Sequence, residues 1–321
     1  MYSSLDVRSN IVNVRLYLKL FDSLVQPVVL YGCEIWGSQC LVGNNPISTF
    51  VNKFYRTLLG VKRHCSNAGV HCELGRYPIE INIAKLMVKY WFRLTTLPTT
   101  RLSAHCYWSL FNCRNLKDPW FDSIKTIINT TGQYHVWKNQ VTLSLSNKNS
   151  ISRAKNYIIQ TIQDVHSQLT SETIHSESKL YLYKNDANSS SPSNYLKTLF
   201  GRDRRAALAN LRLGTTDLEL EKGRHVGIPQ TMRFCKICST QEVENEEHFL
   251  MTCPALSTVR NPFLVSINNM HNNFCNLNKL DKVKFLYFNN SLDIATQTIA
   301  ADMLLALSKS RDMIKSSDIV H

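Results

Sequence analysis

The chain has 321 residues, of which 44% are hydrophobic and 19% charged, which allows a packed core and excludes a disordered polyelectrolyte. The formal net charge of +13 favours an anionic partner, most commonly nucleic acid. This surplus is uneven: residues 1–200 hold 22 Lys and Arg against 11 Asp and Glu, whereas residues 201–321 hold 15 against 13.

Two features of the N-terminal stretch bear on location. The longest apolar run, residues 24–31, contains Gln26 and Pro27 and is too short to span a bilayer, so no membrane partner is expected. Residues before it lack the small-residue cleavage site of a signal peptide. We therefore expect a protein that is not secreted and lies in the nucleus, the cytoplasm or both. Its ten cysteines would then be reduced and free to bind metal.

Helical periodicity dominates the first hundred residues. Apolar residues recur at helical spacing over residues 11–31, 47–60 and 79–97, and a proline or glycine kinks or ends each segment. Leu24 and Phe50 belong to these apolar sets, so both are expected to face inward.

The rest of the chain is also predicted to be mainly helical. Amphipathic segments are predicted around residues 103–113, 119–131 and 151–168, and one or two helices over 282–315 close the chain. Residues 185–194, NDANSSSPSN, have the composition of a flexible linker.

The sharpest chemical signal is the spacing Cys235-x2-Cys238-x9-His248-x4-Cys253. Three thiols and an imidazole suit tetrahedral zinc, and four protein ligands leave no open position, so we predict a structural Zn²⁺ ion. The alternative is four unrelated residues in a cysteine-rich chain, and Cys275 is a possible substitute ligand.

Charged residues surround this predicted site. Residues 242–247 include four glutamates, which we interpret as a solvated loop within the zinc module. Arg233, Lys236 and Arg260 are expected to offset the negative charge of three thiolates and could donate hydrogen bonds near the metal.

Four strings in the chain together suggest a family. RFCKICSTQEVENEEHFLMTCPAL (233–256) resembles the Cys/His cluster near the C-terminus of LINE-type (non-LTR) retrotransposon reverse transcriptase polyproteins, and residues 211–229 resemble the approach to it. LFDSLVQPVVLYGCEIWG (20–37) is similar to the family's segment after the polymerase palm, and residues 50–94 continue the pattern.

The resemblance implies a domain organisation and partners. It implies a thumb-like helical region (1–97), a helical linker region (98–195), an Arg-rich segment with a zinc knuckle (196–260) and C-terminal helices (261–321). The implied partners are RNA, DNA or both, and a palm-containing reverse transcriptase chain is a further possibility.

The resemblance does not carry catalysis over. The palm of such polymerases uses an aromatic-x-Asp-Asp motif to hold two divalent ions, and this sequence contains no Asp-Asp pair. We therefore expect no enzymatic activity.

Basic residues are the candidate contacts with nucleic acid. On the predicted helix 79–97, Lys85, Lys89 and Arg93 are spaced by about one turn, so they could follow a phosphate backbone; an ordinary solvated helix face is the alternative. The full candidate set is Lys53, Arg56, Lys62, Arg63, Lys85, Lys89, Arg93, Arg202, Arg204, Arg205, Arg212, Arg224 and Arg233.

Other functions fit the same sequence. A zinc-stabilised protein-interaction module would bind through an apolar surface, so its affinity should depend little on salt. An accessory subunit could complete a palm supplied by another chain. The non-functional remnant of a transposon reading frame is the third alternative.

Overall fold

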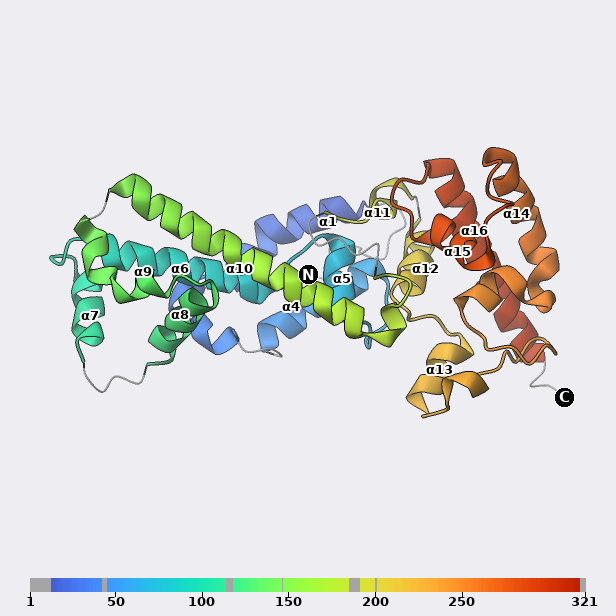
Figure 1. The fold of residues 1–321 in the computed structure, drawn as a ribbon, viewed down its shortest axis with the longest axis horizontal. Helices are drawn as coiled ribbons and strands as arrows, with labels where there is room; N and C mark the ends of the chain where they lie inside the picture. The colour runs from blue at the N-terminus through green and yellow to red at the C-terminus, as the bar shows by residue number, and fades with distance from the viewer. Residues whose placement is uncertain are drawn as a thin grey trace. The chain divides into compact units, whose positions relative to one another are not determined.

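The chain is almost wholly helical wherever its structure is described (Figure 1). The computed structural model describes residues 13–41, 45–113, 118–145, 147–184, 191–199 and 201–317. These residues contain no β-strand, only one antiparallel bridge between Phe234 and Val243. None of their helices is both long and apolar enough to cross a bilayer. The mainly α prediction is confirmed, whereas most of the expected linker, 185–190, lies outside the described residues.

Two compact units make up the chain, and each combines stretches that are distant in sequence. The central unit comprises residues 20–52 and 77–172, and the C-terminal unit comprises 1–19, 53–76 and 173–321. This division differs from the four consecutive regions expected from the sequence. The reason is that residues 53–76 belong with the C-terminal stretch rather than with the helices on either side of them.

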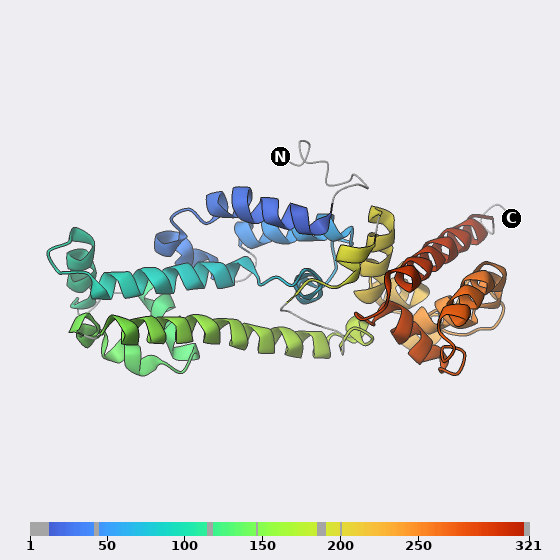
Figure 2. The same cartoon turned by 90° about the horizontal axis from the view of Figure 1, so that it is seen from above.

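The central unit is built around α6 (Ile79–Thr96), which contacts α3, α7 and α8, and α10 runs alongside α6 (Figure 2). Its elements are a π-helical turn Phe21–Val25, α2 Gln26–Val29, α3 Cys33–Trp36, a 3₁₀ turn Gly37–Cys40, α7 Leu102–Phe111, α8 Pro119–Thr130, α9 Tyr134–Lys138, a 3₁₀ turn Gln140–Leu145 and most of α10 Lys148–Ser176. α1 Val14–Leu20 and α4 Pro46–Leu59 contribute residues to both units.

Aromatic side chains form the core of the central unit. Trp91 on α6 is fully buried and stacks on Trp137 with ring centroids 5.7 Å apart. Its indole N–H donates to the Tyr107 hydroxyl at 2.8 Å, and that hydroxyl donates in turn to the Gln140 side chain. The buried polar side chains of Trp91, Tyr107 and Gln140 therefore bond to one another.

The first predicted helix contains a change of helical type. α1 continues into the π-helical turn, where the Gln26 N–H bonds the Phe21 carbonyl, immediately before Pro27. Proline lacks an N–H and clashes with the carbonyl four residues earlier, so a local change of helix register accommodates it.

The prediction that Leu24 and Phe50 are buried is wrong. Leu24 is 53% exposed and Phe50 is 39% exposed. Leu24 lies in the π-helical turn, whose extra residue rotates it out of the α-helical stripe. The buried apolar residues of α4 are Val51, Tyr55, Leu58 and Leu59, and Phe50 lies on the flank of the apolar face that they form.

The C-terminal unit packs around α16 (Ile294–Ser317), which contacts α12, α14 and α15. Met303, Leu304 and Leu307 are buried on this helix. The other elements of the unit are α5 Asn67–Leu74, a 3₁₀ turn Ser178–Leu180, α11 Tyr195–Thr198, α12 Arg202–Arg212, α13 Glu219–His225, a 3₁₀ turn Gln230–Met232, a π-helical turn His248–Thr252, a 3₁₀ turn Pro254–Leu256, α14 Ser257–Met270 and α15 Lys279–Tyr287.

A glycine allows α5 to end against a neighbouring segment. Gly75 has a φ of +59° and terminates α5 in the left-handed conformation. A Cβ at this position would lie 2.3 Å from the Ser191 carbonyl carbon, so only glycine fits. The Ser193 N–H bonds the Glu73 carbonyl at 2.9 Å, which fixes the same segment to α5.

A buried ion pair links α5 to α12. Arg212 Nε donates to Glu73 Oε1 at 2.7 Å, and the two side chains are 2% and 0% exposed. The guanidinium also donates to the Tyr287 carbonyl at 2.7 Å and lies over the rings of Tyr183 and Tyr195. These contacts satisfy a charge that would otherwise be costly to bury.

We predict that Arg212→Met lowers the free energy of unfolding by about 3–5 kcal/mol, because it leaves the Glu73 carboxylate buried without its partner. The double variant Arg212→Met/Glu73→Leu should recover much of this loss, since it removes both charges. Urea denaturation of the two single variants, the double variant and the parent measures both effects. A double variant as unstable as the sum of the two single variants would contradict this account.

Candidate metal centre

The four predicted ligands come together in the C-terminal unit. The sulfur atoms of Cys235, Cys238 and Cys253 and a ring nitrogen of His248 all lie within 4.8 Å of one another. Cys238 Sγ is 3.4 Å from His248 Nε2. A tetrahedral zinc ion with ordinary bond lengths places neighbouring ligand atoms about 3.5–3.8 Å apart. This cluster can therefore hold a metal ion after only small side-chain movements.

A short hairpin positions the two cysteines of the Cys-x2-Cys pair. The Cys235 N–H bonds the Glu242 carbonyl at 2.8 Å, and the Glu244 N–H bonds the Arg233 carbonyl at 2.9 Å. Gln241 turns the chain back with a φ of 54°. These backbone bonds hold Cys235 and Cys238 at one end of the hairpin, so that both sulfurs reach the cluster.

The other two ligands are brought together by a π-helical turn. In residues 248–252 the Cys253 N–H bonds the His248 carbonyl at 2.8 Å, which is an i→i+5 bond. The turn begins where the His248 N–H bonds Asn245 Oδ1 at 2.7 Å. The spacing of five residues, suitable in principle for a helix start or a tight turn, thus places both side chains on one side of the chain.

Hydrogen bonds orient the imidazole. His248 Nδ1 lies 2.7 Å from Glu242 Oε2 and 3.2 Å from Thr252 Oγ1, and the ring is buried. With Nδ1 engaged by a carboxylate, Nε2 is the nitrogen that faces the sulfurs. Sequence reasoning did not single out Glu242; a carboxylate near a ligating histidine is the signal that could have found it.

Hydrogen bonds within the cluster shift the pKa values of Cys235, His248 and Cys253. A hydrogen bond with Cys253, together with burial, raises the pKa of Cys235 to about 12, and the same hydrogen bond lowers the pKa of Cys253. Hydrogen bonds with Cys235, Glu242 and Cys238 raise the pKa of His248 to about 9, against the effect of burial. A metal ion must displace these protons, so its affinity rises with pH.

Two of the four glutamates of residues 242–247 are buried, so the expectation of a solvated loop is wrong for them, whereas Glu242 is exposed. Glu244 is fully buried and Glu246 is 5% exposed. Arg311 on α16 binds Glu244 in bidentate fashion, with both N–O distances 2.6 Å, and the Tyr181 hydroxyl donates to Glu246 at 2.9 Å. Their distant partners explain the error, because local sequence does not show them.

The cations near the cluster have specific partners. Arg260 is buried and donates to the Cys253 carbonyl at 3.0 Å, so it contributes positive charge beside a ligand. Lys236 pairs with Glu219 at 3.1 Å, and Arg233 donates to the Leu220 carbonyl at 2.7 Å. Only Arg260 is thus bonded to a ligand residue, through its backbone.

The remaining candidate ligand lies elsewhere. Cys275 is exposed, and its thiol donates to the Asn272 carbonyl at 3.3 Å rather than joining the cluster. The cluster therefore consists of the four residues chosen from the spacing, and it is closed by its own side chains.

Two of the basic residues predicted to contact nucleic acid are buried, and their assignment is corrected. Arg212 is 2% exposed in its pair with Glu73, and Arg205 is 9% exposed and donates to the Leu199 carbonyl at 3.0 Å. Both guanidinium groups bond to partners inside the C-terminal unit, so they are not accessible to a phosphate group. Their position in an Arg-rich segment did not distinguish them from surface arginines.

Most other members of that set are engaged within the protein. Arg204 binds Asp302 in bidentate fashion at 2.6 and 2.9 Å, and Lys62 pairs with Asp217 at 2.8 Å. Arg56 donates to Asn67, and Lys85 lies over the Tyr77 ring. Arg224 pairs with Glu221, and Arg233 donates to backbone carbonyls. Arg202 is half-buried.

Four basic residues of the set are exposed and form no ion pair within the described residues. Lys89 and Arg93 lie one turn apart on α6 in the central unit, and Lys53 and Arg63 lie in the C-terminal unit. These four have side chains that can reach a ligand in solution.

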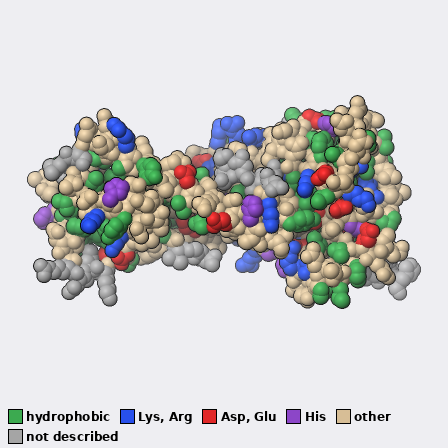
Figure 3. Space-filling model, viewed as in Figure 1, with side chains coloured by type: hydrophobic (Ala, Val, Ile, Leu, Met, Phe, Trp, Pro, Cys, Tyr) green, Lys and Arg blue, Asp and Glu red, His purple; other side chains and the backbone are tan. Residues whose placement is uncertain are grey.

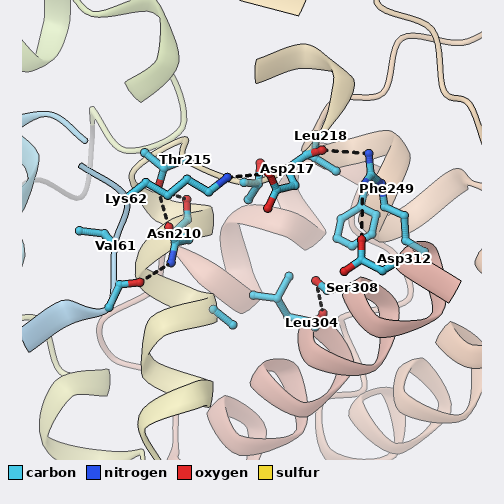
Figure 4. Close-up of a pocket in the computed structure, with 14 residues that line it drawn as sticks. Val61, Lys62, Asn210, Thr215, Asp217, Leu218, Phe249, Leu304, Ser308 and Asp312 are labelled. Atoms are coloured by element: carbon cyan, nitrogen blue, oxygen red, sulfur yellow. Dashed lines mark hydrogen bonds and ion pairs between the residues drawn. The ribbon is translucent and has the colours of Figure 1, made fainter. Parts of the chain in front are cut away.

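A pocket of about 320 Å³ lies in the C-terminal unit beside α12 and α16 (Figure 4). Its charged lining includes Lys62, which pairs with Asp217, and Arg311, which donates to the Asp217 carbonyl at 3.0 Å as well as binding Glu244. Both cations are thus already neutralised, so the pocket does not have the character of a phosphate site.

No family model, no curated protein and no solved structure matches this chain. The assignment of the metal cluster therefore rests on the donor set and its geometry alone.

We predict one zinc ion per chain at this cluster, and the loss of that ion in Cys235→Ser and Cys253→Ser, because each variant removes a thiolate from a closed set of four ligands. Elemental analysis of freshly purified protein measures the zinc content of the parent and of each variant. Cys275→Ser is the matched control, since this cysteine lies outside the cluster, and it should retain the ion. Equal zinc content in all three variants would contradict the assignment.

Proposed function

We propose that this chain is the C-terminal part of a LINE-type reverse transcriptase polyprotein, and that it binds RNA or DNA without catalysing a reaction. The observation that carries the proposal is the Cys/His cluster. The string that resembles the family's cluster, residues 233–256, contains four potential ligands, and all four have their donor atoms close together. A nuclear or cytoplasmic location goes with this function.

In this proposal the metal is zinc and its role is structural. Three sulfurs and one nitrogen suit zinc better than the oxygen-preferring ions Mg²⁺ and Ca²⁺. Four protein ligands complete a tetrahedron and leave no position for a reacting water. The zinc ion would join the hairpin that carries Cys235 to the π-helical turn that carries His248.

Binding to nucleic acid is supported by charge and exposure together. The net charge of +13 favours a polyanion, and the exposed side chains of Lys89 and Arg93 are spaced by one helical turn. Lys and Arg side chains form several small groups on the face shown in Figure 3. Such groups suit contacts to phosphates better than recognition of particular bases.

A second candidate function is a protein-interaction module, and exposed apolar residues favour it. Val28, Tyr31 and Ile35 are 75%, 85% and 63% exposed in the central unit. These three residues lie within eight positions of the sequence, and contiguous apolar surface in solvent is typical of interaction sites. A partner chain that supplies a polymerase palm is one protein that could occupy them.

We predict that Lys89→Glu/Arg93→Glu weakens binding to an RNA or DNA duplex by at least about tenfold at low salt, and about equally for unrelated sequences. The slope of log affinity against log salt should fall by about two, because roughly 0.9 counterions are released per phosphate contact on duplex DNA. Fluorescence anisotropy across a salt series measures both quantities.

The matched control is Lys279→Glu/Lys309→Glu, which changes the net charge equally at two exposed lysines of α15 and α16. It should retain most of the affinity and the salt slope. Equal loss in both double variants would mean that only net charge matters. Binding that is tight in the parent but insensitive to salt would favour the protein-interaction module instead.

A further inference from the structure

A second group of metal-binding side chains lies in the C-terminal unit, apart from the four-ligand cluster. His64, Glu221 and His225 have ligand atoms that all lie within 4.8 Å of one another. His225 Nε2 is 3.4 Å from Glu221 Oε1, and the imidazole rings of His64 and His225 meet edge to face with centroids 4.9 Å apart. Two nitrogens and a carboxylate oxygen thus converge from two separate segments.

The helical spacing of Glu221 and His225 explains why these two side chains lie together. Glu221 and His225 lie four residues apart on α13, so their side chains share one face of the helix. Arg224 binds Glu221 Oε2 at 2.9 Å, which leaves Oε1 as the oxygen that faces His225. Glu221 is 6% exposed, so its carboxylate is held in place.

His64 reaches this face from a turn whose position is fixed by several contacts. Lys62 pairs with Asp217 at 2.8 Å, and the Ser66 hydroxyl donates to Glu177 at 2.6 Å. Lys179 Nζ lies 3.4 Å from the His64 carbonyl. The turn is therefore anchored on both sides of His64, which fixes the backbone of this residue before any ligand binds.

The surroundings of His64 favour the neutral form of its imidazole. Partial desolvation, and then the nearby imidazole of His225, lower the pKa of His64 below its usual value of 6.5, although Glu221 opposes them. A neutral imidazole carries the lone pair that a metal requires.

We infer that His64, Glu221 and His225 form a second metal site, which takes a divalent first-row transition-metal ion such as Zn²⁺ or Co²⁺. Imidazole nitrogen suits these ions, whereas Mg²⁺ and Ca²⁺ prefer an all-oxygen set. Ligands at about 2.0–2.2 Å from the ion lie roughly 3.3–3.5 Å apart in a tetrahedron, so closure needs movements on the order of 1 Å. His64 and His225 are exposed and free to make them.

The chemistry of this site differs from that of the cluster of three cysteines and one histidine. Three protein ligands leave at least one coordination position open, which water would occupy, whereas the cluster closes its own sphere. The ion would also join the turn around His64 to α13, although these segments are far apart in sequence. The inference does not rest on nucleic-acid binding or on the family resemblance.

The test uses the full chain with one equivalent of Zn²⁺ already bound, titrated with Co²⁺ by isothermal calorimetry and absorption spectroscopy. Zinc holds thiolate ligands more strongly than cobalt does, so Co²⁺ should report on the second site. We expect one Co²⁺ per chain, with an absorption spectrum that lacks sulfur-to-cobalt charge transfer.

His64→Ala and His225→Ala should each weaken Co²⁺ binding by at least about tenfold, and the double variant should abolish it. His135→Ala, a change at an exposed histidine of α9, is the matched control and should bind as the parent does. Unchanged circular dichroism would show that the variants fold. Unaltered Co²⁺ binding in the double histidine variant, or no binding by the parent at millimolar Co²⁺, would overturn the inference.

Discussion

The buried ion pair between Glu244 and Arg311 is the interaction on which the metal-binding part of this protein depends. Glu244 is fully buried, and such a carboxylate is costly unless it is paired and hydrogen-bonded. Arg311 supplies two bonds of 2.6 Å, and the Glu219 N–H supplies a third of 2.7 Å. Because the backbone of Glu244 also closes the hairpin that carries Cys235, one residue connects the ligands to α16 and α13.

Through this connection, the metal cluster can influence how α16 packs in the C-terminal unit. The hairpin has a single antiparallel bridge, which is too little to be stable alone. In our account, ligation of a metal by Cys235, His248 and their two neighbours holds the hairpin against the π-helical turn. The ion pair then fixes the hairpin to α16, whose apolar face packs in the centre of the C-terminal unit. Metal binding and helix packing should therefore be coupled.

Local features were predictable from the sequence, and long-range pairs were not. Periodicity over 47–60 and 79–97 predicted α4 and α6 closely, because apolar spacing reports directly on a helix face. The spacing of the cysteines and the histidine likewise predicted four ligands, and the structure places their donor atoms close together. In contrast, Glu244 and Arg311 are 67 residues apart, and Glu73 and Arg212 are 139 apart. Nothing in a local window shows that such charges are buried, which is why Arg212 was assigned to the surface.

Hydrogen exchange with and without metal tests the coupling most directly. Chelation of the metal should remove protection from the amides of residues 233–253 and, to a comparable extent, from those of α16, because Glu244 transmits the loss of the hairpin to Arg311. Amides of α6, in the central unit, serve as the internal reference and should remain protected. Loss of protection confined to residues 233–253, with α16 unchanged, would contradict the account.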